Sequence, residues 1–312
     1  MKRIIQLLIS VLLLVFLVYK LNVRLSDLTG VVQQPYWLLP ALLFPLCINP
    51  VVVNNRWKAF LRMQGVEESV GRLMRITFTS TFLGIVLPSS QGYDLLRIYA
   101  IEKAHPEARG KVGSTILVER LIGLGVLAAI GVTAALFYGN ARLTRMVLCV
   151  TVVLAVGTAL LFERHVFQWL SGGLRAIPFG RRFFGYLADM YQAVRQFPFN
   201  RSLVASCGLI LLLQLSNIAV VYLLFRACGY GISFGFHCLA LPIISLVTMV
   251  PVSFSGFGLR EGAFVYLYDA CQVPGSTAMA VSVMYYIVVM LVPAFIGGIL
   301  HASQSLKQSH ES

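Results

Sequence analysis

The sequence predicts an all-α integral membrane protein that crosses the bilayer several times. Apolar residues make up 58% of its 312 residues and charged residues only 12%, which is about half the charged share of a soluble domain. The charges cluster, and they leave eight long runs that contain no Asp, Glu, Lys or Arg. Most of these runs approach the roughly 20 apolar residues that a helix needs to cross a hydrocarbon core about 30 Å thick.

We expect six spanning helices within residues 1–312, which form a single membrane domain: Ile4–Leu21, Tyr36–Val53, Ser114–Tyr138, Met146–Phe162, Leu203–Phe225 and Ser276–Leu300. Two further apolar stretches are interrupted. Ile76–Leu87 offers twelve residues before a proline, about 18 Å of helix, which is too short to cross. Phe236–Val250 also stops at a proline. A second short helix can follow each break, so we predict two re-entrant hairpins, over residues 76–101 and 236–268.

Charge in the loops decides whether the first interrupted stretch spans the membrane or returns as a hairpin. If it spanned, nine basic loop residues would lie outside and three inside, and a hairpin reverses these numbers. The nine are Lys103, Arg109, Lys111, Arg164, Arg175, Arg181, Arg182, Arg195 and Arg201, and the three are Arg142, Arg145 and Arg226. Short cytoplasmic loops are enriched in Lys and Arg, so the hairpin is favoured.

The predicted topology places both termini in the cytoplasm. The first hairpin enters from the cytoplasm and the second from the outside. The segment 163–201 lies on the cytoplasmic side, and apolar residues recur within it at helical spacing beside Arg181 and Arg182. Two interpretations stay open for this segment: an amphipathic helix in the membrane interface, or a connector packed on the bundle.

The net charge of +13 is interpreted as basic loops that meet anionic head groups. The chain has no basic domain that could carry a nucleic-acid site, so we expect no nucleic-acid partner. Its five histidines lack metal-ligand spacing, and no phosphate loop or Gly-x-Ser-x-Gly motif is present. We therefore expect no enzyme activity, metal or cofactor. The expected location is the cytoplasmic (inner) membrane.

The two breaks resemble each other although their predicted orientations are opposite. Each has a proline, a Ser/Gly turn, and then an arginine with an acid: Asp94 and Arg97 after the first break, Arg260 and Glu261 after the second. Broken helices in corresponding halves of opposite topology are typical of an inverted repeat around a transport site. Irregular backbone at membrane depth must be covered by protein or line water. We therefore expect the two breaks to meet near the bilayer midplane.

Six charged residues fall in or beside apolar segments, where an unpaired charge costs about 2.5–3.5 kcal/mol. Two interpretations are open: a salt-bridge network that locks the hairpins, or arginines that also hold an anionic head group by bidentate hydrogen bonds. In the second, the N-termini of the half-helices after each break add positive dipole ends. The candidate substrate-binding residues are Asp94, Arg97, Glu119, Arg120, Arg260 and Glu261, with Gly92, Gly256 and Gly258.

Two local patterns refine this candidate site. Glu119 and Arg120 are adjacent on a predicted helix and therefore point about 100° apart, so we expect them to pair with different neighbours. The segment Asn54-Asn55-Arg56-Trp57 is predicted to end the second helix. Its Arg and Trp are interpreted as interface anchors, with a role in substrate binding as the alternative.

Three motifs together resemble a known family: Pro88 to Arg97, Val118–Arg120, and Pro251 to Glu261. They are similar to the flippase-like family of the transmembrane domain of lysylphosphatidylglycerol synthase, also called the UPF0104 family, over about residues 4–302. The soluble aminoacyltransferase domain of its bifunctional members is not expected here, so lipid aminoacylation is not implied. The first turn departs from the family pattern, because relatives often have more glycines there.

The resemblance implies a flippase that moves an anionic phospholipid or a lipid-linked glycolipid intermediate between leaflets. Its expected partners are membrane lipids and, in addition, enzymes of lipid biosynthesis. An accessory protein that scaffolds a glycolipid or cell-envelope biosynthesis complex is the alternative, and a membrane-embedded lipid transferase is a third reading.

Overall fold

The computed structural model describes residues 30–85, 92–138, 141–163, 180–249 and 256–311. In these ranges the chain consists of helices and short connections. Among the described residues, five helical rods are long and apolar enough to cross a membrane: Pro35–Met63, Lys111–Tyr138, Ala141–Ala159, Arg201–Ala227 and Gly275–Ser303. They correspond to five of the six predicted spans. The remaining prediction, Ile4–Leu21, lies outside the described residues.

The first and last rods contain prolines and stay helical through π-turns. In the first, α3 (Leu38–Leu43) continues through the π-turn Phe44–Ile48 into α4 (Asn49–Met63). In the last, α14 (Gly275–Tyr286) continues through the π-turn Ile287–Leu291 into α15 (Val292–Glu311). Local π geometry accommodates a proline, which lacks a backbone N–H. Each rod therefore keeps the length needed to span.

Three uninterrupted helices complete the long framework. α7 (Lys111–Tyr138) packs against α8 (Ala141–Phe162), and α11 (Arg201–Ala227) packs against both α4 and α7. At 1.5 Å per residue α7 is about 42 Å long, enough to cross the hydrocarbon and reach both interfaces. α7 therefore provides a scale against which the depth of other residues can be judged.

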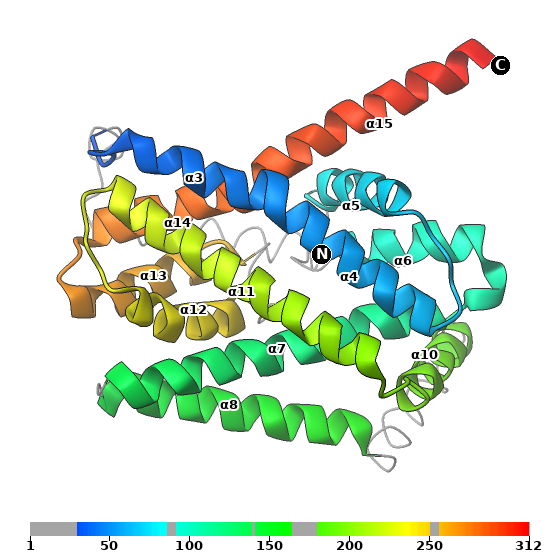
Figure 1. Cartoon of the computed structure of the whole chain (residues 1–312), viewed down its shortest axis with the longest axis horizontal. Coiled ribbons are helices and arrows are strands. Elements are labelled where there is room, and N and C mark those ends of the chain that lie inside the picture. The colour runs from blue at the N-terminus through cyan, green and yellow to red at the C-terminus, as the bar shows by residue number, and fades with distance from the viewer. Residues whose placement is uncertain (1–29, 86–91, 139–140, 164–179, 250–255, 312) are drawn as a thin grey trace.

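Four short helices form two packed pairs. α5 (Val70–Gly84) packs against α6 (Gly92–Ala104), and α12 (Phe234–Met249) packs against α13 (Leu259–Tyr268). The two pairs lie at opposite ends of the molecule in Figure 1. Even the longest of the four, α12, is only about 24 Å long. The connections 86–91 and 250–255, which hold most of both predicted breaks, lie outside the described residues.

Two buried clusters fix these pairs against the long helices. On one side Tyr268 of α13 stacks on Phe225 of α11 at 4.1 Å between ring centroids, and its hydroxyl lies 2.7 Å from Nδ1 of His237 on α12. On the other side the indole of Trp57 is fully buried among apolar residues of α5, α6 and α7. This second cluster brings the polar residues of α4, α6 and α7 together.

Helix α10 (Gly180–Arg195) lies in the segment that was predicted to be amphipathic. It packs on the start of α7, with Ala193 and Val194 buried. The Tyr186 hydroxyl donates a hydrogen bond to Glu102 Oε1 at 3.1 Å. Burial raises the pKa of Glu102 above its ordinary value even though that carboxyl also accepts the Gly110 N–H. The C-terminal part of α10 is thus held on the bundle.

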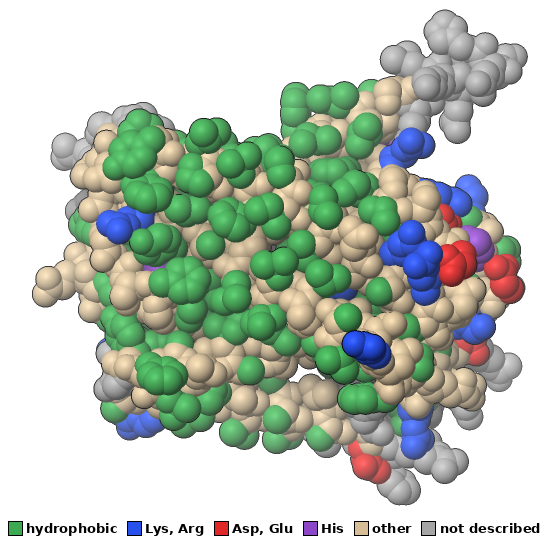
Figure 2. Space-filling view, viewed as in Figure 1, with side chains coloured by type: hydrophobic (Ala, Val, Ile, Leu, Met, Phe, Trp, Pro, Cys, Tyr) green, Lys and Arg blue, Asp and Glu red, His purple; other side chains and the backbone are tan. Residues whose placement is uncertain are grey.

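Charge is distributed unevenly over the surface. Figure 2 shows apolar side chains across the middle of the molecule and charged side chains gathered mainly at the end where α4 finishes and α7 begins. Exposed aliphatic and aromatic side chains include Leu136, Phe137, Val153 and Phe295. An exposed apolar band of this kind is stable when hydrocarbon surrounds it.

Glycines allow two close helix contacts beside the first short pair. A Cβ added at Gly297 of α15 would lie 2.0 Å from the carbonyl oxygen of Phe78 on α5, and one added at Gly84 would lie 2.8 Å from the Tyr93 Cβ on α6. Small residues let membrane helices approach closely enough for backbone contact. The α5–α15 and α5–α6 interfaces therefore depend on the absence of a side chain.

We expect Gly297→Ala to destabilise the protein by about 1–3 kcal/mol, because the added methyl overpacks the α5–α15 interface. Thermal or chemical unfolding of the purified protein in detergent measures the effect. Gly157→Ala on α8 is the matched control, since a Cβ there meets nothing within 4 Å. Equal stabilities for the two variants would contradict the prediction.

Candidate functional site

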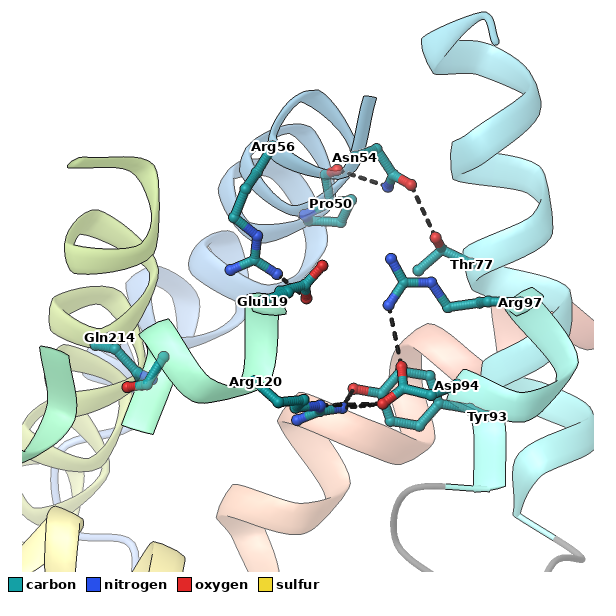
Figure 3. Close-up of polar contacts among 11 residues, drawn as sticks. Pro50, Asn54, Arg56, Thr77, Tyr93, Asp94, Arg97, Glu119, Arg120 and Gln214 are labelled. Carbon is teal, nitrogen blue, oxygen red and sulfur yellow. Dashed lines mark hydrogen bonds and ion pairs between the residues drawn. The ribbon is translucent and has the colours of Figure 1, made fainter. Parts of the chain in front are cut away.

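Five buried or partly buried charged residues meet where α4, α6 and α7 pack together. We call this group the arginine cluster: Arg56 on α4, Asp94 and Arg97 on α6, and Glu119 and Arg120 on α7. Figure 3 shows their side chains converging from the three helices. Four of the five were predicted as site residues, and the packing of α6 on α7 brings these four into one place.

Asp94 accepts hydrogen bonds from two arginines on different helices. Arg97 Nη1 donates to Asp94 Oδ1 at 3.1 Å, and Arg120 Nε donates to Asp94 Oδ2 at 3.0 Å. Arg120 also donates to the hydroxyl of Tyr93. Asp94 lies in the first turn of α6, where the helix dipole favours a negative charge. One carboxylate thus ties α6 to α7 and orients both guanidinium groups.

Arg97 is almost completely buried, at 1% exposure, and only partly satisfied. Its guanidinium lies over the Trp57 ring, 4.0 Å from the centroid. Its Nε and Nη2 have no hydrogen-bond partner among the described residues. The N–H groups on these two nitrogens point to the same side and form the fork with which arginine binds two oxygens of a phosphate or carboxylate.

Glu119 and the adjacent Arg120 form ion pairs with residues on different helices. Arg56 Nη2 and Glu119 Oε1 form a buried ion pair across α4 and α7, whereas Arg120 pairs with Asp94. The expectation that Glu119 and Arg120 would find different partners is confirmed. Arg56 Nε and Glu119 Oε2 lack a hydrogen-bond partner in the described part of the chain.

The interpretation of Arg56 and Trp57 as interface anchors is wrong. α4 continues to Met63 instead of ending near Val53, so both residues lie inside the helix, Arg56 with 4% and Trp57 with 0% exposure. Their position follows from partners on other helices, Glu119 for the arginine and Arg97 for the indole.

Neutral polar groups extend the cluster toward neighbouring helices. Asn54 of α4 accepts a hydrogen bond from the Thr77 hydroxyl of α5 at 2.8 Å and donates to the Pro50 carbonyl at 2.7 Å. Gln214 of α11 donates to the Gly123 carbonyl of α7 at 3.2 Å. In Figure 3 Arg97 lies between the Asn54–Thr77 pair and Asp94. Hydrogen bonds and ion pairs thus connect α4, α5, α6 and α7.

A second, more local group surrounds Arg260 on α13. Its Nε and Nη2 both donate to Glu261 Oε1, at 3.1 and 2.6 Å, and Nε also donates to the Ser282 hydroxyl at 3.1 Å. The guanidinium lies over the rings of Phe257 and Tyr286, 5.2 and 4.6 Å from their centroids. The binding fork of Arg260 is therefore occupied within the protein, unlike that of Arg97.

Two of the three predicted glycines adopt conformations that L side chains rarely take. Gly256 has φ +77° and Gly258 has φ +82°. The Gly258 N–H donates to Glu261 Oε2 at 2.6 Å, so the third residue of α13 caps the start of its own helix. Gly92, the other predicted glycine, is the buried first residue of α6.

The predicted residues thus form two groups that lie at similar depths from opposite ends of the bundle. Glu119 and Arg120 lie about 12–14 Å along α7 from Lys111, and Ser282 lies about 11 Å along α14 from Gly275. Figure 1 shows these two helix starts on opposite sides of the molecule. Whether the breaks meet at the midplane concerns segments 86–91 and 250–255, which are outside the described residues.

Comparison with known proteins identifies the family of the chain. The profile described as the lysylphosphatidylglycerol synthase TM region matches residues 3–297. The chain belongs to this family. A UPF0104 membrane protein of Methanocaldococcus jannaschii is 19% identical over 289 residues, covering 85% of this chain and 83% of its own length. A UPF0104 membrane protein of Methanothermobacter thermautotrophicus is 23% identical over 296 residues, covering 85% and 82%. No solved structure matches the chain.

Membership of this family establishes a multi-pass membrane protein and is consistent with a lipid-related role. In chemical terms the arginine cluster can hold an anion: it contains three guanidinium groups against two carboxylates, and Arg97 has an unused fork. No group of His, Cys, Asp and Glu within the described ranges could hold a metal ion.

We expect Glu119→Gln to be more destabilising than Arg56→Gln. Removing one partner of a buried ion pair costs about 3–5 kcal/mol, and loss of Glu119 leaves three arginines with one carboxylate. The double variant should cost less than the two single variants added together. A double-mutant cycle on unfolding free energies in detergent measures this coupling.

The exposed pair Arg62–Glu67 supplies the control for this cycle. Its neutralisation should cost less than about 1 kcal/mol because both side chains face solvent. Equal effects in the buried and exposed pairs would show that the Arg56–Glu119 contact does not hold α4 to α7.

Proposed function

We propose that the protein translocates an anionic phospholipid or a phosphate-linked glycolipid intermediate between the leaflets of the cytoplasmic membrane. One observation carries the proposal: Arg97 is buried inside a membrane protein, and two N–H groups on one edge of its guanidinium have no partner among the described residues. A buried arginine with an open fork is suited to two oxygens of a phosphate, which would also balance the third positive charge of the arginine cluster.

The cluster's hydrogen bonds support a role for the acids in positioning the arginines. Asp94 holds Arg97 and Arg120 side by side at about 3 Å from its two oxygens. Arg120 is the more exposed of the two, with 33% of its side chain accessible. A phosphate arriving at Arg120 can therefore compete with Asp94 for that guanidinium and pass to the fork of Arg97.

In this proposal the two short helix pairs, α5–α6 and α12–α13, are the elements that move during transport. We infer that α5–α6 and α12–α13 are the two re-entrant hairpins of an inverted repeat, because each is too short to span and each carries an arginine–acid pair beside a break. Because the two hairpins lie at opposite ends of the bundle, a lipid would enter from one leaflet at the arginine cluster and from the opposite leaflet at Arg260. Transport rather than catalysis is proposed, driven by a lipid gradient or a coupled ion.

We expect Arg97→Gln to lower lipid translocation about tenfold or more, because it removes the charge and the fork that hold the phosphate. Proteoliposomes with fluorescent phosphatidylglycerol and a membrane-impermeant quencher measure the rate. Arg62→Gln, at an exposed arginine of α4, should leave the rate unchanged. Arg97→Lys should give an intermediate rate, since it keeps the charge and loses the fork.

The neutral double variant Asp94→Asn/Arg97→Gln separates transport from structure. Recovery of transport in it would mean that the pair only stabilises the fold, and the proposal would fall. Purified protein that leaves phosphatidylglycerol and phosphate-linked glycolipids in their original leaflets would favour an accessory role in a lipid-biosynthesis complex.

A further inference from the structure

A second feature near the arginine cluster is an apolar groove between α7, α11 and α12. It has a volume of about 720 Å³ and is lined almost wholly by carbon. Figure 1 shows α7 and α11 diverging toward the Tyr138 end of α7, with α12 between them. The lining residues are Val126, Ala129, Ile130, Thr133, Ala134, Phe137, Tyr138, Cys207, Gly208, Leu211, Leu215, Gly235 and Cys238.

The groove opens sideways, on the surface that faces lipid. On α7 the lining residues Ala129, Thr133 and Phe137 recur every four positions and are exposed, and Leu211 of α11 is exposed opposite them. A side opening on the apolar band leads into hydrocarbon rather than water. Its natural occupant is therefore an apolar chain that can enter from the bilayer.

The dimensions of the groove favour a single hydrocarbon chain. From Val126 to Tyr138 it follows α7 for about 18 Å, close to the roughly 15 Å depth of one leaflet's hydrocarbon. Dividing 720 Å³ by this length gives a mean cross-section of about 40 Å². A groove of this length and width can take one extended hydrocarbon chain.

The groove continues the arginine cluster along one helix. Val126, its first lining residue, lies about 9 Å along α7 from Arg120. Between them the Gln214 side chain donates to the Gly123 carbonyl and closes α7 against α11. Arg120, with its partly exposed guanidinium, thus lies just beyond one end of the groove, and Tyr138 lies at the other.

We propose that the groove holds one acyl chain of the lipid whose phosphate the arginine cluster binds. This inference rests on the proposed function and gives its substrate an orientation: head group toward the Lys111 end of α7, tail toward the Tyr138 end. The recognised unit is then a phosphate with a long apolar chain, and a soluble phosphate ester would use only half of the site.

Gly208→Leu tests the groove, because a Cβ at Gly208 meets nothing within 4 Å and the added chain can occupy the space without disturbing the fold. Equilibrium binding to purified protein in detergent is measured for two lipids with one head group, dioleoyl and dibutyryl phosphatidylglycerol. We expect at least about tenfold weaker dioleoyl binding in the variant and unchanged dibutyryl binding. Gly157→Leu on α8, also open, should alter neither.

The outcomes distinguish the groove from the head-group site. Equal dioleoyl binding by the Gly208→Leu and Gly157→Leu variants would overturn the groove, even if Arg97→Gln abolishes binding of both lipids. If Arg97→Gln binds both lipids normally, the phosphate site fails and the proposed function with it. Conversion of an oligomer to a monomer by Gly208→Leu, measured by light scattering, would show that the groove is a protein interface and overturn the proposal.

Cross-linking of the unaltered protein provides a test that does not depend on a variant. Phosphatidylglycerol with a photoreactive group in its acyl chain should attach to Phe137 and Leu211 in preference to Val152 and Val153, which are exposed on α8. Excess unlabelled lipid should suppress the groove adducts first. Uniform labelling of both faces would mean ordinary surrounding lipid and would overturn the proposal.

Discussion

The hydrogen bonds of Asp94 to two arginines are the interaction on which the arginine cluster depends. Without a shared carboxylate, Arg97 and Arg120 would stand close together in a poorly solvated interior, where like charges repel strongly. Asp94 places the two guanidinium groups on either side of itself, and the outer edge of Arg97 has no hydrogen-bond partner in the part of the chain that the structure describes. The Trp57 ring then supports the same guanidinium from its face. One carboxylate thus joins α6 to α7 and sets the arrangement of the arginines in the proposed anion site.

The two halves of the molecule use similar residues in different arrangements. At the first break the arginine and acid are three residues apart, and further charges come from α4 and α7. At the second, Arg260 and Glu261 are adjacent and are completed by Ser282 and two aromatic rings. Glu261 also caps its own helix. Within the described ranges, the guanidinium of the second group is hydrogen-bonded to its neighbours, whereas the first group keeps donors that have no partner.

The sequence predicted the features that depend on local spacing and composition. The helical class, five of the spans, the Asp94–Arg97 pair and the divergence of Glu119 from Arg120 all follow from such patterns. It did not predict that α4 continues through Arg56 and Trp57, because hydropathy falls there and only partners on α6 and α7 keep those residues buried. Nor could it show the groove, which arises where three helices diverge. Topology with respect to the two sides of the membrane remains a prediction from charge.

The placement of the two arginine groups has an energetic consequence. A phosphate crossing bare hydrocarbon meets a single high barrier, since its hydration is lost all at once. Guanidinium groups about 11–14 Å in from opposite ends of the bundle would divide that path into three shorter stretches, each ending at a counter-charge. In the proposed cycle the phosphate binds the two arginine groups one after the other. The rate is then set by how readily the phosphate replaces a carboxylate as the partner of a guanidinium group.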